Sequence, residues 1–396
     1  MERTLYREIK ATQGVWTLAV IMLGLIAVAA WSVLYVEHNG HAVTGMNNQI
    51  VWGLPHVFAI ILIVAASGAL NVASIASVFD RKAYKPLSRL SGILAIALLV
   101  GGLLVLVLDL GRPDRLLVAM TTFNFSSIFT WNILLYTGFM GIVGMYLWVQ
   151  MDRSVHPKFV KPVGVLAFVW RLILTTGTGS IFGWLVARPG YDAAVMAPMF
   201  IALSFSLGLA VFLIVLIALY RLDERKIGDE IIARLTHLLG IFIAAAMYFA
   251  VLQHVTNLYA AEHSGIERFI LREGGIFTTL FWWGQIALGG LLPLALIFGK
   301  HPSNASSRAI VASILVILGA FAQLYVIIIG GQAYPMEMFP GYEITSSFYD
   351  GAIASYSPSF FELALGVGGV AVAILTTGIA AKVLRILPTN LADKKT

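Results

Sequence analysis

Few side chains in the long apolar stretches of this sequence can exchange protons, and several of those few stand at the ends of such stretches. His56 follows Trp52 at the start of one stretch, and Asp109 ends the next, shortly before Arg112. A histidine titrates near neutral pH, and a well-placed carboxylate can give or take a proton. Trp52, His56, Asp109 and Arg112 therefore form the first candidate site.

The residues around Asp109 also have a plainly structural interpretation. Asp109 and Arg112 are three residues apart, so on a helix they can pair on one face, and Pro113 ends the helix. We expect such a pair here. In this interpretation the pair is a salt bridge that ends the helix at the membrane surface and has no other role.

A second group, Gln253, His254 and Asn257, falls within one helical turn of a later apolar stretch. A lone histidine at a membrane surface is usually a solvated helix end. Three polar side chains at one depth are less easily explained in that way. We predict that they take part in a path for protons.

Arg171 lies about eight residues inside another apolar stretch, and Thr175 and Thr178 follow on the same helix face. Ionisable groups at membrane depth are costly and rare, so each is a candidate for function. Arg171 could add a polar path toward the cytoplasm. The alternative is that its long side chain reaches the membrane surface or pairs with a neighbouring helix.

These residue types permit a quinone site without requiring one. A quinone needs an apolar slot, hydrogen-bond donors for its ring oxygens and a side chain that exchanges protons. The sequence has no cysteine, which excludes thiolate metal sites and cysteine-ligated iron–sulfur clusters within this chain. A membrane haem would need two histidines at one depth, and only His56 and His254 match. No span carries the two well-separated histidines typical of di-haem bundles, so a b-type cytochrome is the weaker alternative. We therefore expect neither haem nor a metal site.

The elements that hold these residues must be membrane helices. Of the 396 residues, 59% are hydrophobic and only 12% are charged, with a mean hydropathy of +0.88. Soluble domains carry about 25% charged residues, so lipid must surround much of this chain. The apolar run 15–36 is too long for a signal peptide and is expected to stay as a helix. Ten stretches are long enough to span: 15–36, 54–78, 90–108, 127–150, 163–186, 197–220, 236–258, 277–298, 309–329 and 360–384.

The basic residues set the expected orientation. If the ten spans alternate in direction, 20 Lys and Arg fall on the side of both chain ends and five on the other, with Arg171 inside. Cytoplasmic loops carry the excess of Lys and Arg, so both termini are predicted to be cytoplasmic. This explains the net charge of +6 better than binding to nucleic acid does.

The longer loops fall on the external side, and 331–359 is the longest of them. Long loops without regular structure are commonly functional or bound to a partner. We therefore expect the chemistry or a partner on the external side, with 331–359 as a docking surface.

Three sequence segments resemble the polytopic NrfD/PsrC family of membrane subunits, which serve polysulfide reductases, hydrogenases and related complexes. The run LDLGRP (108–113) matches a family hallmark, and ten spans match the longer branch of the family. The segments NNQIVWGLPH (47–56) and GGQAYPMEMFPGYE (330–343) are similar to the DsrP-type branch, which belongs to the sulfur-metabolism complex DsrMKJOP. The resemblance covers nearly the whole chain.

The resemblance implies a single all-α membrane domain (1–396) with two four-helix bundles (54–186 and 197–329) and a flanking helix at each end (15–36 and 360–384). It implies that menaquinone or ubiquinone binds in the N-terminal bundle near the outer leaflet, at Trp52, His56, Asp109 and Arg112. Other branches often carry an acidic residue in the second span. Here His56 is its titratable group, so the family's proton transfer cannot be carried over.

The resemblance also implies an external iron–sulfur ferredoxin-like partner (DsrO-like), a multihaem cytochrome c (DsrJ-like) and a DsrMK-like module in the cytoplasmic membrane. The expected function is electron exchange between the quinone pool and that iron–sulfur subunit, with or without proton translocation. The chain is not expected to catalyse a reaction alone. The alternative is a secondary transporter or ion channel without a redox role. Transporters show inverted repeats and broken helices, and neither is evident here.

Overall fold

The computed structural model describes residues 4–152, 154–299, 304–336 and 351–391. Within them, ten helices are long and apolar enough to cross a membrane, which confirms the predicted number of spans. Their ends lie within a few residues of most predicted ends, and extra helical turns lengthen several of them. The spans are Gln13–Asn39, Leu54–Ser77, Lys82–Leu108, Ile128–Met151, Pro157–Gly183, Met196–Leu222, Asp229–Tyr259, Ile276–Phe298, Ala305–Ala333 and Phe360–Val383.

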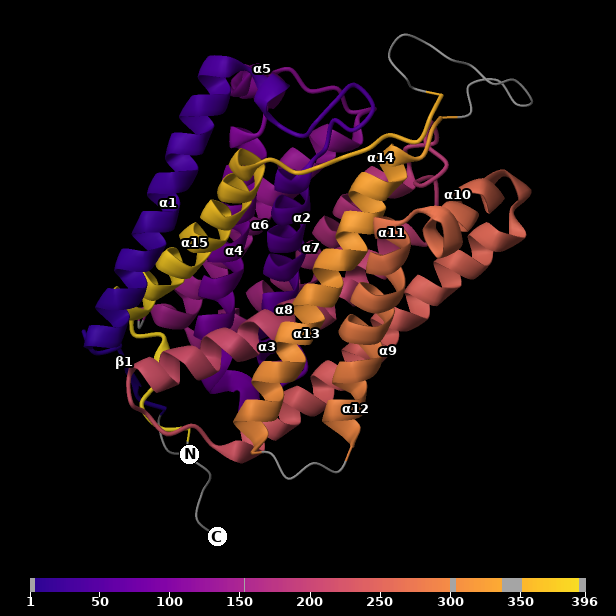
Figure 1. Ribbon diagram of the computed structural model, residues 1–396. Helices are drawn as coiled ribbons and strands as arrows, with labels where there is room; N and C mark the ends of the chain where they lie inside the picture. The colour runs from indigo at the N-terminus through magenta and orange to yellow at the C-terminus, as the bar shows by residue number, and fades with distance from the viewer. Residues whose placement is uncertain (1–3, 153, 300–303, 337–350, 392–396) are drawn as a thin grey trace.

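Five spans are single α-helices, and Figure 1 labels them α1 (Gln13–Asn39), α6 (Ile128–Met151), α8 (Met196–Leu222), α9 (Asp229–Tyr259) and α15 (Phe360–Val383). The others contain local changes of helix type or short breaks. These composite spans are α2 (Leu54–Ala69) with α3 (Asn71–Ser77), η2 (Lys82–Leu87) with α4 (Ser88–Leu108), η4 (Pro157–Phe159) with α7 (Val160–Gly183), α11 (Ile276–Thr279) with η7 (Leu280–Leu291) and α12 (Leu292–Phe298), and α13 (Ala305–Tyr325) with η8 (Val326–Gly330) and α14 (Gly331–Ala333).

Helix α2 lies at the centre of the molecule and packs on α4, α8 and α15. In its most apolar window 89% of the residues are buried, against 17% for α1. Gly68 of α2 and Gly208 of α8 bring the two backbones into contact. A Cβ added at Gly68 would lie 1.6 Å from the carbonyl oxygen of Ser204. Small residues allow this approach where no hydrophobic force separates helix from lipid.

We call residues 54–183 the N-terminal bundle and residues 196–333 the C-terminal bundle. Helices α2 and α8 join them. The first and last spans are distant in sequence, yet α1 packs along α15, and α15 packs on α4 and α2 (Figure 1). The last span therefore lies against the N-terminal bundle, and the first span packs on the last.

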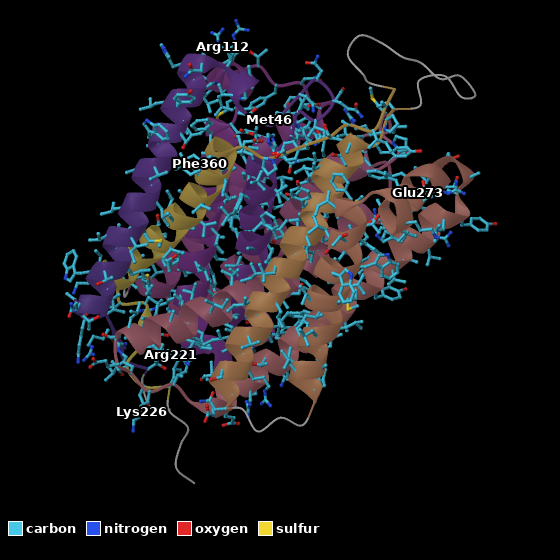
Figure 2. All side chains as sticks on the ribbon, in the orientation of Figure 1. Met46, Arg112, Arg221, Lys226, Glu273 and Phe360 are labelled. Atoms are coloured by element: carbon cyan, nitrogen blue, oxygen red, sulfur yellow. The ribbon has the colours of Figure 1, made fainter. Side chains whose placement is uncertain are left out.

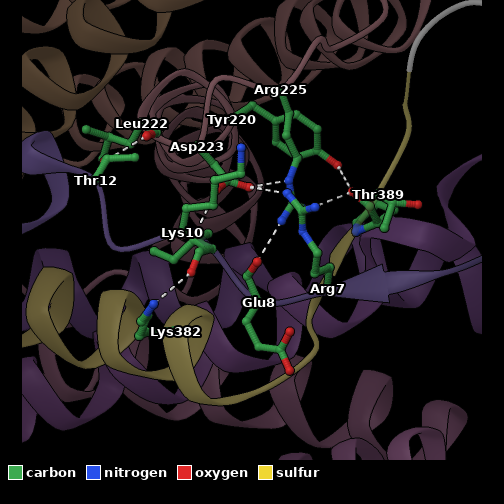
Figure 3. A network of polar contacts seen from close by, with 12 residues as sticks. Arg7, Glu8, Lys10, Thr12, Tyr220, Leu222, Asp223, Arg225, Lys382 and Thr389 are labelled. Carbon is green, nitrogen blue, oxygen red and sulfur yellow. Dashed lines mark hydrogen bonds and ion pairs between the residues drawn. The ribbon is translucent and has the colours of Figure 1, made fainter.

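The described parts of both chain ends meet on one side of the molecule, which we call the termini face. Strand β1 (Tyr6–Arg7) pairs antiparallel with β2 (Leu387–Pro388). Beneath them the buried Asp223 pairs with Arg225 and accepts a hydrogen bond from the backbone N–H of Lys10 (Figure 3). Arg221 and Lys226 lie on this face, whereas Arg112 and Glu273 lie on the opposite face (Figure 2).

Candidate functional site

The first candidate site forms where α2 begins and α4 ends, on the opposite face. His56 lies in the first turn of α2, which Pro55 helps to start, and Asp109 caps the end of α4. The His56 Nδ1 and Asp109 Oδ2 atoms are 2.8 Å apart, with side chains 15% and 6% exposed. Neither atom makes a well-aligned hydrogen bond, although both are buried. The two groups meet at ion-pair distance, and their buried atoms can still hydrogen-bond to a further group.

Aromatic rings cover one side of the pair. The Trp52 ring stacks on the His56 ring with centroids 5.9 Å apart, and Phe182 meets Trp52 edge-on at 6.0 Å. Tyr191 stacks on Trp52 at 6.3 Å and is buried. The polar pair therefore adjoins a wall of flat apolar surfaces.

The backbone at Trp52 is held by a side chain from the C-terminal bundle. The Gln332 Oε1 atom accepts hydrogen bonds from the N–H groups of Val51 and Trp52, both at 3.0 Å. The Gln332 Nε2 atom donates to the Trp52 carbonyl at 3.0 Å, and Gln332 is only 1% exposed. Gln332 lies in the segment 330–343 that carries the family resemblance, but nothing in its sequence context predicted a role for it. A buried amide that satisfies an irregular segment fixes the position of the Trp52 ring.

Two further groups brace the same segment. Arg188 donates to the carbonyls of Gln332 and Gln49, both at 2.9 Å, and burial lowers the pKa of its guanidinium. The Tyr356 hydroxyl donates to Glu362 at 2.6 Å and accepts from the Leu54 N–H at 2.6 Å. Burial, and then its hydrogen bond to Glu362, raise the pKa of Tyr356. Residues 351–359, which carry Tyr356, cross the opposite face toward α15 (Figure 1).

The expected pairing of Asp109 with Arg112 is wrong. Arg112 forms a bidentate pair with Asp114 at 3.0 and 2.8 Å, and both side chains are mostly exposed. The chain leaves the helix at Asp109, so the three-residue spacing no longer places the two side chains on one helix face. The structure brings together Trp52, His56 and Asp109 and leaves Arg112 at the surface.

In the second predicted group, His254 and Asn257 both contact Glu267, a residue that was not predicted. Glu267 accepts a hydrogen bond from Asn257 Nδ2 at 3.0 Å, and its other oxygen lies 2.8 Å from His254 Nδ1. Glu267 is fully buried. The predicted spans leave it in an external loop, but the helix α10 (Ser264–Arg268) folds it back onto α9. The apolar neighbours Ile266 and Phe269 are the only feature of the sequence here that indicates burial of Glu267.

Two small cavities adjoin this second group. The first, of about 20 Å³, is lined by Gln253, His254, Asn257 and Glu267 among others. The second, of about 30 Å³, continues deeper into the C-terminal bundle. Drug-sized ligands need roughly 300–1,000 Å³, so neither cavity holds a quinone ring in this structure.

Arg171 does not reach the membrane surface. Its side chain is buried, donates to the Ser67 carbonyl at 3.2 Å and lies over the Phe168 and Phe205 rings. Thr175 bonds to the Ser67 hydroxyl at 2.6 Å. The guanidinium thus joins α7 to α2 and α8 within the bundle. Its predicted part in a proton path stays a prediction.

The fold and the polar groups define an all-α integral membrane protein with ionisable pairs near one face. The family described as "Polysulphide reductase, NrfD" matches residues 42–336, and the chain belongs to this family. The match contains both candidate groups.

Relatives match over most of their length. The Hdr-like menaquinol oxidoreductase integral membrane subunit of Archaeoglobus fulgidus is 27% identical, covering 96% of this chain and 95% of its own. A putative dimethyl sulfoxide reductase membrane subunit of Halobacterium salinarum is 27% identical over 94% and 91%. A polysulfide reductase chain of Wolinella succinogenes is 24% identical over 72% of this sequence and 96% of its own.

Proposed function

We propose that this chain is a quinone-interacting membrane subunit of an oxidoreductase complex, and that the quinone head meets the protein at His56 and Asp109. The observation that carries the proposal is the pair of buried, close but unaligned polar atoms beside the Trp52 ring. Relatives named as parts of menaquinol oxidoreductase and polysulfide reductase support it. They favour menaquinone, and ubiquinone is the alternative.

The residues of the site suit that role. A bound quinone supplies two-electron chemistry that needs protons at its ring oxygens. An imidazolium at His56 can donate a hydrogen bond to a ring oxygen, and the Asp109 carboxylate beside Nδ1 can take up the proton that His56 gives up. Trp52 offers a flat face for stacking. Gln332 keeps that face in place through the backbone of Trp52.

The chain itself is not expected to carry electrons onward. It has no cysteine, so an iron–sulfur cluster bound by cysteine must belong to a partner. We propose that such a subunit, DsrO-like, docks on the opposite face, together with DsrJ-like and DsrMK-like subunits of a sulfur-metabolism complex. The proposed docking segment 331–359 lies partly outside the described residues, because 337–350 are not described.

The excess of basic residues on the termini face supports an orientation with both termini in the cytoplasm, in the cytoplasmic membrane. The opposite face is then external. We further propose that quinone turnover is coupled to proton movement, with Gln253, His254, Asn257 and Arg171 as candidates for the path.

The test compares H56Q and D109N with D114N in the assembled complex. Loss of an acid or base group costs about 10²–10⁴-fold in rate, so we expect quinol oxidation to fall at least 100-fold in the first two variants. The exposed Asp114 is the matched control and should leave the rate unchanged. Full activity in both H56Q and D109N would contradict the site.

A further inference from the structure

Glu267 is a fully buried carboxylate that the proposed quinone site does not use. It lies on α10, which packs against the end of α9 on the opposite face (Figure 1). The nearby Arg268 and Glu273 pair with each other at the surface, with nitrogen and oxygen 3.8 Å apart. The groups that compensate the charge of Glu267 are therefore His254 and Asn257.

The His254–Glu267 pair can hold one proton at no net charge. The proton rests either on the imidazole, giving an ion pair, or on the carboxyl group, leaving both groups neutral. Two charges buried together cost far less than one alone, so gain of a second proton or loss of the first is the costly step. The Asn257 Nδ2 group donates a hydrogen bond to one oxygen of Glu267, and His254 Nδ1 lies beside the other. The pair is therefore chemically suited to take up and release a proton.

Other polar groups around the pair are already engaged. The His263 ring nitrogen Nδ1 lies 3.0 Å from the carbonyl oxygen of Pro189. Arg188 donates to the backbone carbonyls of Gln49 and Gln332. Tyr334 packs its ring on Phe269. Exchange at Glu267 thus depends mainly on His254 and on whatever enters the cavity beside it.

The adjoining cavities have the size and lining of water sites. A cavity needs about 10–15 Å³ to hold one water molecule, and a buried water needs two to four polar partners. The first cavity, of about 20 Å³, offers the Glu267 group together with Gln253. Gln285 and Gln323 line both this cavity and the second, of about 30 Å³, which also reaches Ser206.

The second cavity lies deeper in the bundle. Met247 and Ala250 line it, whereas Asn257 lines the first. The second cavity also reaches Ile243, 14 residues before Asn257 on the 31-residue α9, which is about 21 Å at 1.5 Å per residue. The two cavities together therefore lead from the opposite face to about half the length of α9.

Three π-helical segments form walls of these cavities. They are η6 (Phe269–Glu273), η7 and η8, and they supply Ile270, Gln285 and Val326 to the lining. π-Helical turns are rare and often occur at functional sites, because they displace side chains from the regular helical register. Here they accompany the amide side chains that line the cavities.

We propose that Glu267 and His254 form a proton-exchange site in the C-terminal bundle, connected through water in the two cavities to the middle of the bundle. This deepens the proton-coupling part of the proposed function and rests on it for its biological purpose. The exchange itself needs no quinone, so it can be tested separately.

The test is infrared difference spectroscopy of the full-length chain in lipid, titrated with pH and repeated in D₂O. We expect a carboxyl signal that titrates and shifts rapidly in D₂O in the wild type and in E262Q, a matched exposed control. E267Q should lose this signal, and H254Q should move its midpoint. Identical difference spectra for wild type and folded E267Q would overturn the proposal.

A second variant, E267D, keeps the proposal testable if E267Q does not fold. E267D keeps the carboxylate but moves it by one methylene, so its titration midpoint should differ from that of the wild type. A wild-type midpoint in E267D would also overturn the proposal. Quinone binding is measured in parallel. E267Q should bind within about twofold of the wild type, whereas absence of binding in the wild type would count against the quinone site alone.

Discussion

Each bundle holds a histidine and a carboxylate 2.8 Å apart at the same face, but the two pairs differ in their hydrogen bonds. In the C-terminal bundle, His254 and Asn257 satisfy both oxygens of Glu267. In the N-terminal bundle, His56 and Asp109 approach without a well-aligned hydrogen bond. The same residue types therefore make one closed pair and one that remains open to a further partner.

The residues that surround the two pairs also differ. Flat aromatic rings adjoin His56, as expected for a pair that meets a flat ligand. Water-sized cavities lined with amides adjoin Glu267. In the described residues, all three π-helical segments belong to the C-terminal half of the chain. The comparison separates ligand binding in one bundle from proton exchange in the other.

The largest expected difference between the pairs is in stability. Glu267→Ala leaves His254 and Asn257 buried without their partner, and breaking such a buried pair costs about 3–5 kcal/mol. Asp109→Ala removes a contact that is not aligned, so we expect about 1–3 kcal/mol. Denaturant unfolding in detergent measures both, with Glu262→Ala as the exposed control. Equal losses of unfolding free energy in Glu267→Ala and Asp109→Ala would show that the two pairs do not differ in their contribution to stability.

A smaller effect is expected from the link between the bundles. Gln332→Leu removes three hydrogen bonds to the backbone of Val51 and Trp52. We expect a loss of about 1–3 kcal/mol in stability and, because the Trp52 ring loses its support, about tenfold weaker quinone binding. Gln13→Leu, at an exposed position, is the control. Unchanged quinone affinity in Gln332→Leu would show that the Gln332 hydrogen bonds do not position the Trp52 ring for quinone binding.

The smallest effect is expected at Arg112. The hydrogen bond from Arg112 lowers the pKa of Asp114, so this contact stabilises the fold above the ordinary pKa of an aspartate and is lost as pH falls through the lowered value. Both groups are exposed, so solvent screens the pair. Arg112→Gln should raise the pKa of Asp114 and leave quinone affinity unchanged. A clear loss of affinity would return Arg112 to the site.

Much of the fold was predictable because the requirement for about 20 apolar residues per span is severe. The charge alternation indicated the same ten helices. The neighbouring positions of α1 and α15 were not predictable, because every face of both helices is apolar and helical spacing does not say which partner each face meets.

The sites were predictable only in part. His56, Asp109 and His254 stood out as polar residues at the ends of apolar runs. Glu267 did not, because a carboxylate in a charged loop looks solvated until the short helix α10 folds it inward. Arg112 was misassigned because helical spacing was applied beyond the residue where the helix ends.

The central claim is that the quinone head binds at the N-terminal pair, and a photoreactive quinone tests it most directly. The full-length chain is labelled in lipid, digested and mapped by mass spectrometry, with excess unlabelled menaquinone as competitor. We predict competed labelling of the segments that carry Trp52, His56 and Asp109. Competed labelling confined to residues 253–285 of the C-terminal bundle would contradict the account.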